Sequence, residues 1–227
     1  EKPAEMLPKE AGHNRFAWDL RADPPVQIPG AFYAGLPPRG PRVLPGKYTV
    51  RLSVSGKTLE APLDLRMDPR ATASPAGLAK QFDLAMKVRE RMSDLHRAVN
   101  RLRDVREQLQ TMSEHLASDP QRTALAERAR SISKALTTVE EELVQVKVKR
   151  SEGTLRFPTM LNEQLDSLRY VVESADGAPA ASVFEVFDEL SARLDTTLAA
   201  FAAVMSKDLP AFNAEVRAAG VPAVIAP

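Results

Sequence analysis

The sequence predicts an α+β protein of two domains: a small antiparallel immunoglobulin-like β-sandwich, then an antiparallel four-helix bundle with a long first helix. Two observations predict this. Residues 1–70 hold 11 of the 18 prolines and 6 of the 10 glycines, among short alternating apolar runs. From residue 71 onward, apolar residues recur every three to four positions, which is typical of amphipathic helices. We therefore assign residues 1–70 to the β-domain and residues 71–227 to the helical bundle.

The β-domain is predicted from three alternating segments. Phe16, Trp18 and Leu20 alternate with other residues, as in a half-buried strand. Residues 45–54 and 59–67 alternate in the same way, and Ser55-Gly56 between them is suited to a tight hairpin turn. Two alternating runs around a tight turn indicate an antiparallel sheet, which we expect to belong to a sandwich.

A loop rich in proline and glycine is expected at residues 23–46, because proline breaks both helices and central strands. Its adjacent aromatic residues, Phe32 and Tyr33, are the predicted ligand-contact residues if the loop binds anything. Aromatic rings on a β-domain can stack on sugars, so carbohydrate binding by this loop is one hypothesis. A purely structural role for the loop is the other.

The helical part is predicted to begin at Ser74-Pro75, an N-cap residue followed by proline at the first helical position. The first apolar stripe runs from Leu78 to Leu116. Further stripes follow Pro120, Pro158 and Pro179, and Pro210 should kink or interrupt the last helix. Short connections favour antiparallel neighbours, so an up-down-up-down bundle is the simplest arrangement.

Composition excludes several classes of function. The net charge of +1 argues against a nucleic-acid-binding protein, which needs a basic surplus. No apolar run reaches the length of a transmembrane segment. Cysteine is absent, which removes disulfides, thiol nucleophiles and zinc–thiolate sites.

No pattern of reactive residues indicates catalysis, so we predict no catalytic, cofactor-binding or metal-binding residues. The sequence lacks the glycine-rich phosphate loops and the serine-hydrolase elbow. His96 and His115 are expected about 28 Å apart along one helix, too far to share a metal. The run Glu140-Glu141-Glu142 is interpreted as a solvated helix face.

Two groups of segments resemble a known family. The segment AGHNRFAWDLR (11–21), followed by VLPGKYTVRLSVSGKT (43–58), resembles the immunoglobulin-like unit of flagellar hook-capping proteins. The same pattern is found near the C-terminus of exported bacterial proteins with sortilin-type or neuraminidase-repeat β-propellers, often labelled glycosyl hydrolases. The helical segments FPTMLNEQLDSLRYVVESAD (157–176), VFDELSARLD (186–195) and DLPAFNAEVRAAGVPAV (208–224) resemble the helical tail of those proteins.

The resemblance implies a location outside the cytoplasm and a parent protein whose propeller would hold any active site. The chain begins with Glu1 rather than Met, and we interpret it as a piece of a longer protein. The leading hypothesis is a non-catalytic structural or interaction module that contacts the parent propeller domain or another protein, or self-associates through its helices. The alternatives are a carbohydrate-binding accessory region and a part of a glycosidase whose site spans the propeller and the β-domain.

Overall fold

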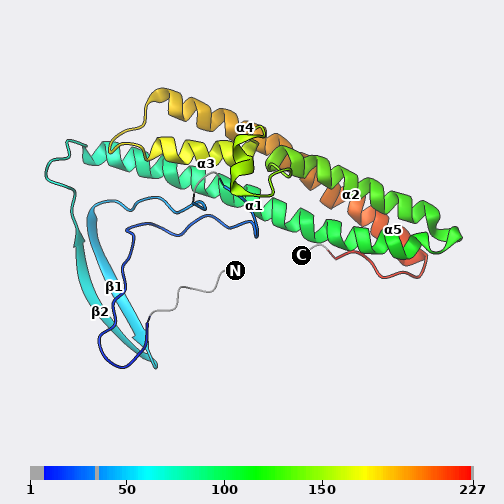
Figure 1. The fold of residues 1–227 in the computed structure, drawn as a ribbon, viewed down its shortest axis with the longest axis horizontal. Coiled ribbons are helices and arrows are strands. Elements are labelled where there is room, and N and C mark those ends of the chain that lie inside the picture. Colours follow the sequence, from blue (N-terminus) through cyan, green and yellow to red (C-terminus); the bar gives the residue numbers. More distant parts are fainter. Residues whose placement is uncertain (1–7, 34–35, 226–227) are drawn as a thin grey trace.

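The computed structural model of the protein describes residues 8–33 and 36–225. Figure 1 shows a long helical body from which a thin arm leaves near one end. The helical elements are α1 (Pro75–Ala117), η1 (Pro120–Arg122), α2 (Thr123–Leu143), η2 (Ser151–Leu155), α3 (Leu161–Val172), α4 (Ala181–Ala203), the π-helical turn η3 (Val204–Asp208) and α5 (Leu209–Ala218). The strands are β1 (Gly46–Val54) and β2 (Lys57–Leu65).

Helix α1 runs the length of the helical body, with 43 residues. At 1.5 Å per residue it is about 64 Å long. It begins at the predicted signal: the Ser74 hydroxyl accepts a hydrogen bond from the Gly77 amide at 3.1 Å, and Pro75 is the first helical residue. Helices α2, α3 and α4 pack along this one, whereas α5 packs on α2.

Helices α2 and α3 lie one after the other along α1, both antiparallel to it (Figure 1). Contacts with α1 show the order: Arg103 with Glu140 and Arg106 with Thr137 on α2, then His96 with Asn162 on α3. The chain from α4 to α5 then returns along them as a third rod.

The predicted up-down-up-down four-helix bundle is therefore wrong. Four helical stripes were expected to form four neighbouring rods, but two of them share one rod. The reason is local: Val144 adopts an extended conformation (φ −138°, ψ 151°), which ends α2. The linker that follows restarts the helix without reversing its direction, so α3 extends the line of α2.

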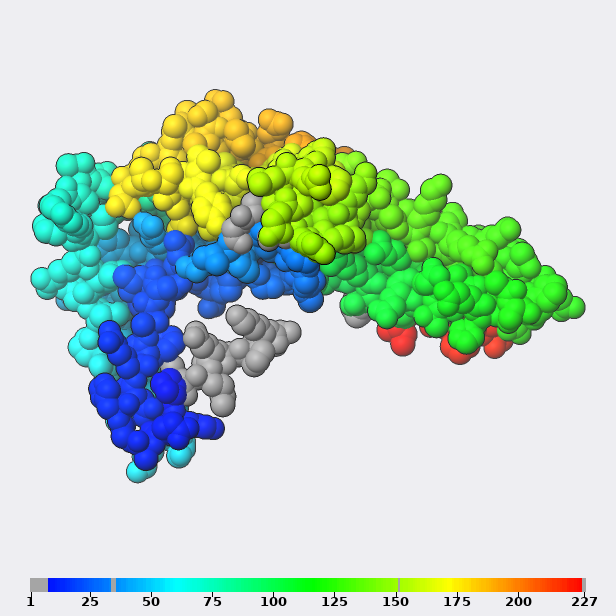
Figure 2. All heavy atoms as spheres, viewed as in Figure 1, coloured from blue at the N-terminus to red at the C-terminus, as the bar shows by residue number. Residues whose placement is uncertain are grey.

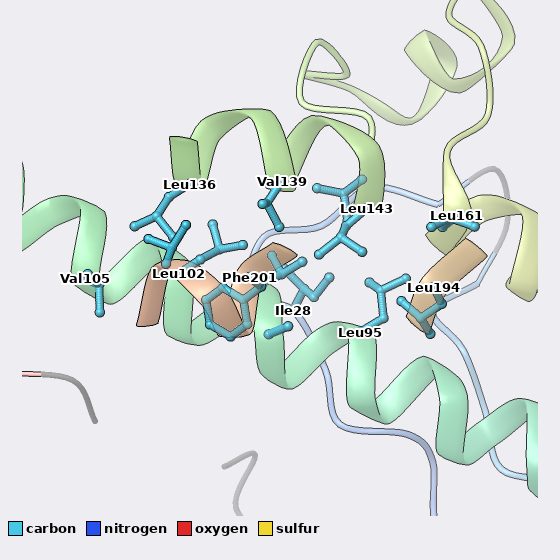
Figure 3. Close-up of a cluster of buried hydrophobic side chains, with 14 of the residues drawn as sticks. Ile28, Leu95, Leu102, Val105, Leu136, Val139, Leu143, Leu161, Leu194 and Phe201 are labelled. Atoms are coloured by element: carbon cyan, nitrogen blue, oxygen red, sulfur yellow. The ribbon is translucent and has the colours of Figure 1, made fainter. Parts of the chain in front are cut away.

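A single apolar core fills the space between the three rods, and Figure 3 shows part of it. Leu95, Leu102 and Val105 of α1 have no exposed surface. They meet Leu136 of α2 and residues of the other helices, and each fully buried side chain of this kind contributes about 1.5–3 kcal/mol. Ile28, from the proline-rich segment, also lies in this core.

Helix α4 continues into α5 despite Pro210. The Leu209 amide donates to the carbonyl of Val204, five residues earlier, so the turn between the helices is of the π type. Pro210 then falls in the first turn of α5, where a missing amide is tolerated. After α5, the tail folds back: Asn213 exchanges two hydrogen bonds with Val224, at 2.8 and 2.9 Å.

The predicted immunoglobulin-like β-sandwich is also wrong, because the described residues form one sheet of two strands. Strands β1 and β2 pair antiparallel around Ser55-Gly56, as predicted, and both turn residues have positive φ as in a type I′ turn. The expected strand around Phe16 and Trp18 does not form, and only an isolated bridge joins Arg21 to Arg42. Residues 9–23 contain no proline themselves, but the segment that follows, residues 24–45, has seven and offers few amide donors to a partner strand.

The N-terminal quarter of the chain has two different environments, as Figure 2 shows. We define the hairpin arm as residues 8–20 and 43–70, which project from the helical body (Figure 1). We define the strap as residues 21–33, which lie against α1. Arg21 anchors their junction, with an Nη1 atom 2.9 Å from Glu173 on the helical body.

Candidate functional site

The strap is held on α1 by a stripe of polar side chains. Arg89 donates to the carbonyl of Asp23 at 3.1 Å, and Asn100 donates to that of Gln27 at 3.0 Å. Between them, Ser93 accepts from the Val26 amide at 3.3 Å. These residues, with His96, recur at intervals of four, three and four, so they share one helix face. Side chains of the helix thus both donate to and accept from the backbone of a segment that forms no strand.

His96 is the central contact of this stripe and is fully buried. Its Nδ1 faces the carbonyl of Val26, and its Nε2 lies 2.7 Å from Oδ1 of Asn162. Asn162 Nδ2 donates to Glu163 at 3.1 Å, which fixes the orientation of the amide. Both ring nitrogens therefore face acceptors.

Next to the strap lies a cavity of about 410 Å³. It occupies the break between α2 and α3, where residues 144–160 leave the line of the rod. The strap forms one wall with Ile28, Phe32 and Tyr33. The other walls come from α1, from the end of α2 with its linker, and from α3. A volume of this size is in the range of small-molecule sites.

A buried carboxylate lies on one side of the cavity. Glu140 has a side chain that is 3% exposed, and it bonds to both Arg103, at 2.6 Å, and Arg106. The two guanidinium groups are about one-third exposed. The prediction that Glu140 belongs to a solvated face with its two neighbours is wrong for this residue, because α2 turns it toward α1.

The two predicted ligand-contact residues, Phe32 and Tyr33, both line the cavity. Phe32 is 42% exposed, whereas Tyr33 is 7% exposed. Burial raises the pKa of Tyr33 to about 12, and the nearby Asn162 side chain opposes this rise. No well-formed hydrogen bond joins the Tyr33 hydroxyl to any described residue. Their role in ligand contact stays a prediction.

Helix α3 also lines the cavity, with acidic groups that already have partners. Asp166 accepts from Arg169 at 2.8 and 3.0 Å. Burial raises the pKa of Asp166, while Arg169 and His96 act in the opposite direction. Glu163 accepts from the Met160 amide at 2.7 Å and thereby caps α3. These carboxylates therefore stabilise the helix rather than offer free acids.

The polar stripe on α1 was not predicted, although its spacing is visible in the sequence. Ser93, His96 and Asn100 follow the apolar stripe with the same spacing, one position later. A regular polar stripe beside an apolar one indicates a second partner for the helix. His13 and His115, the other histidines, are exposed and lie far from this site in sequence.

A second candidate surface is one face of the hairpin. Leu52 is paired with Leu59, Val50 with Ala61 and Tyr48 with Leu63, so these side chains share a face. We call this the apolar hairpin face. Its largest exposed members are Val50 (51%), Leu52 (42%), Val54 (58%) and Leu59 (70%). Trp18 packs edge-on against Tyr48, with ring centroids 5.9 Å apart, yet remains 37% exposed.

Neither the remaining features of the described residues nor the comparisons with known proteins point to a further candidate site. Residues 8–33 and 36–225 contain no group of three or more metal-ligating side chains. None of the helices described is both apolar and long enough to cross a membrane. Comparisons with protein-family models, curated proteins and solved structures found no match to this chain.

Proposed function

We propose that this chain is a non-catalytic interaction module of an exported bacterial protein, and that its apolar hairpin face packs on a β-propeller domain of that protein. The exposed apolar face is the observation that carries the proposal. The helical body serves as a rigid mount for the arm.

The physical argument starts from the hairpin itself. An isolated two-stranded hairpin is marginally stable in water, and an exposed cluster of large aliphatic side chains marks an interaction surface. The opposite face of the same hairpin is polar: Arg51 pairs with Glu60 at 2.8 Å, and the Ser53 and Thr58 hydroxyls lie 3.1 Å apart. One face is therefore suited to water and the other to a partner.

The nature of the partner is inferred from chemistry and from the sequence resemblance. Three of the residue pairs on the apolar hairpin face, Tyr48–Leu63, Val50–Ala61 and Leu52–Leu59, carry no charge. Lys57, opposite Val54, is charged but lies at the tip, so the face fits an apolar surface better than a charged one. The motifs at residues 11–21 and 43–58 resemble units that accompany β-propellers. A propeller of the same exported protein is accordingly the proposed partner.

Attachment of the arm to the helical body supports a bracing role. Glu173, near the end of α3, accepts from Arg21 at 2.9 Å and from the Arg42 amide at 2.8 Å. Both Arg21 and Glu173 are largely buried there, with exposed side-chain fractions of 16% and 11%. Since this clamp lies where the arm leaves the body, it fixes the direction of the arm.

The test uses Trp18, the single tryptophan of the chain, as a reporter. The chain is titrated with the purified β-propeller domain of the exported protein that carries it. We expect a blue shift of Trp18 emission and a saturable binding curve, because a partner that covers the apolar hairpin face removes water from the indole. The double variant Leu52→Ser, Leu59→Ser should weaken binding at least tenfold.

The matched control is Arg51→Gln with Glu60→Gln, which changes the polar face of the same two strands. It should leave binding within about twofold. Absence of any Trp18 shift or binding, with a folded chain and a folded propeller, would contradict the proposal. Equal effects of the two double variants would show that the apolar face is not the contact surface.

A further inference from the structure

The cavity beside the strap has features of a ligand site that the interaction with a propeller does not use. Tyr33 supplies the first of them. Tyr33 lines the cavity, and its buried hydroxyl makes no hydrogen bond of good geometry with a described residue, although the Asn162 side chain is near enough to oppose the rise in its pKa that burial causes. A buried polar group without a partner costs about 1–3 kcal/mol, so such groups in native proteins call for an explanation. A ligand oxygen in the cavity would accept this hydrogen bond.

The second feature is an excess of donors on the α1 side. Arg103 and Arg106 converge on the one carboxylate of Glu140, so two guanidinium groups share a single negative charge. Arg103 uses its Nε for this contact and Arg106 its Nη1. Each guanidinium has five N–H groups, so both retain donors. Lys149 adds another cationic side chain to the lining.

The third feature is that the acids of the opposite wall are already paired. Glu163 is bonded to the Met160 amide and Asn162, and Asp166 to Arg169. Asp166 therefore does not compensate the positive charge near Arg103, and Glu163 is held by neutral donors at the start of α3, away from the Arg103–Glu140–Arg106 cluster. Apolar side chains, among them Ile28, Phe32, Val144 and Phe157, form the remaining lining.

We propose that this cavity binds a small organic acid, with its carboxylate at Arg103 and Arg106, its apolar body against Phe32 and Val144, and an oxygen accepting from the Tyr33 hydroxyl. Arginine forks suit carboxylates, because two parallel N–H groups match the two oxygens. A neutral sugar would leave the surplus charge without a counterion, so it fits this cavity less well. The inference does not depend on the proposed contact with a propeller.

The experiment is calorimetric titration of the whole chain with three monocarboxylates: phenylacetate, 4-hydroxyphenylacetate and hexanoate. Phenylacetamide is the probe without charge, and cellobiose is the neutral sugar probe. We expect at least one acid to bind, phenylacetamide to bind at least tenfold more weakly, and cellobiose to give no heat. Higher salt should weaken binding of the acid, since the contact is ionic.

Two variants locate the bound acid. Arg103→Gln leaves Arg106 to pair with Glu140 and should raise the Kd about tenfold, a change that corresponds to about 1.4 kcal/mol. Tyr33→Phe preserves the ring and should raise the Kd threefold or more. The matched control is Arg101→Gln, an exposed position on the same helix outside the cavity, which should leave the Kd unchanged.

Several results would overturn the inference. These are no binding of any of the three acids at 10 mM to the folded chain, equal binding of phenylacetate and phenylacetamide, or binding of cellobiose in place of the acids. Equal weakening by Arg101→Gln and Arg103→Gln would place the acid on the helix surface and would also overturn it. Trp18 reports on the arm, whereas calorimetry reports on the cavity. A propeller titration that shows no binding would therefore not bear on the binding of an acid in the cavity.

Discussion

The helical body and the hairpin arm both carry regular apolar patterns, yet only one of them buries its pattern. In the body, Leu95 and Leu102 lie at a period near 3.6 and have no exposed surface. In the arm, Leu52 and Leu59 lie on one face of a two-residue repeat and are 42% and 70% exposed. The body contains three rods that cover one another, whereas the arm has one sheet, and among the described residues Trp18 covers its apolar side only near Tyr48. A regular pattern therefore shows which face needs a partner, but not whether the same chain provides it.

The largest expected effect separates the two regions by stability. Leu102→Ala should reduce the free energy of unfolding by about 2–5 kcal/mol, because it leaves a cavity in the core. Leu52→Ala, on the exposed face, should change it by no more than about 0.5 kcal/mol. Urea unfolding followed by far-ultraviolet circular dichroism measures both. Equal losses would mean that the arm is as well packed as the body.

A second prediction concerns the charge buried inside the body. Glu140→Ala removes the shared partner of Arg103 and Arg106 and should cost about 2 kcal/mol, less than a fully buried pair because both guanidinium groups reach solvent. Glu141→Ala, the exposed neighbour, is the control and should be nearly neutral. The same unfolding measurement applies. A neutral Glu140→Ala would show that the two arginines do not depend on this carboxylate.

A third prediction tests how the strap joins the arm to the body. His96→Leu removes hydrogen bonds to Val26 and Asn162 and should destabilise the chain by about 1–2 kcal/mol. Amide exchange should rise in residues 26–33 more than in α4, as measured by hydrogen exchange. His115→Leu, on the exposed side of the same helix, is the control. Uniform exchange in both variants would mean that the strap does not depend on His96.

The smallest expected effect is a spectroscopic one at the edge of the cavity. Burial raises the pKa of Tyr33 to about 12, so its folded-state pKa lies above the unfolded value of about 10. The stabilisation from the neutral phenol is complete below pH 10 and is lost as the pH rises toward 12. Absorbance near 295 nm should show a phenolate transition close to pH 12. Tyr33→Phe should remove that transition, and its persistence would assign it to another tyrosine.

Several features of the fold could be predicted from the residues because they depend on near neighbours. The Ser55-Gly56 turn lies between two alternating runs, and Ser74-Pro75 begins α1 with a cap and a proline. The apolar stripe of α1 is buried as its period predicts. In each case the interacting groups are a few positions apart, so local periodicity contains the information.

What only the tertiary structure decided was the partner of each segment. The residues around Phe16 did not gain a neighbouring strand, so no sandwich formed, and α2 and α3 joined into one rod because Val144 ended a helix without a reversal. Burial of Tyr33 beside exposed Phe32, and the polar stripe from Arg89 to Asn100 under the strap, also required the fold. The physical reason is that periodicity defines which face of a segment seeks contact, while contacts between residues far apart in sequence depend on how every segment packs at once.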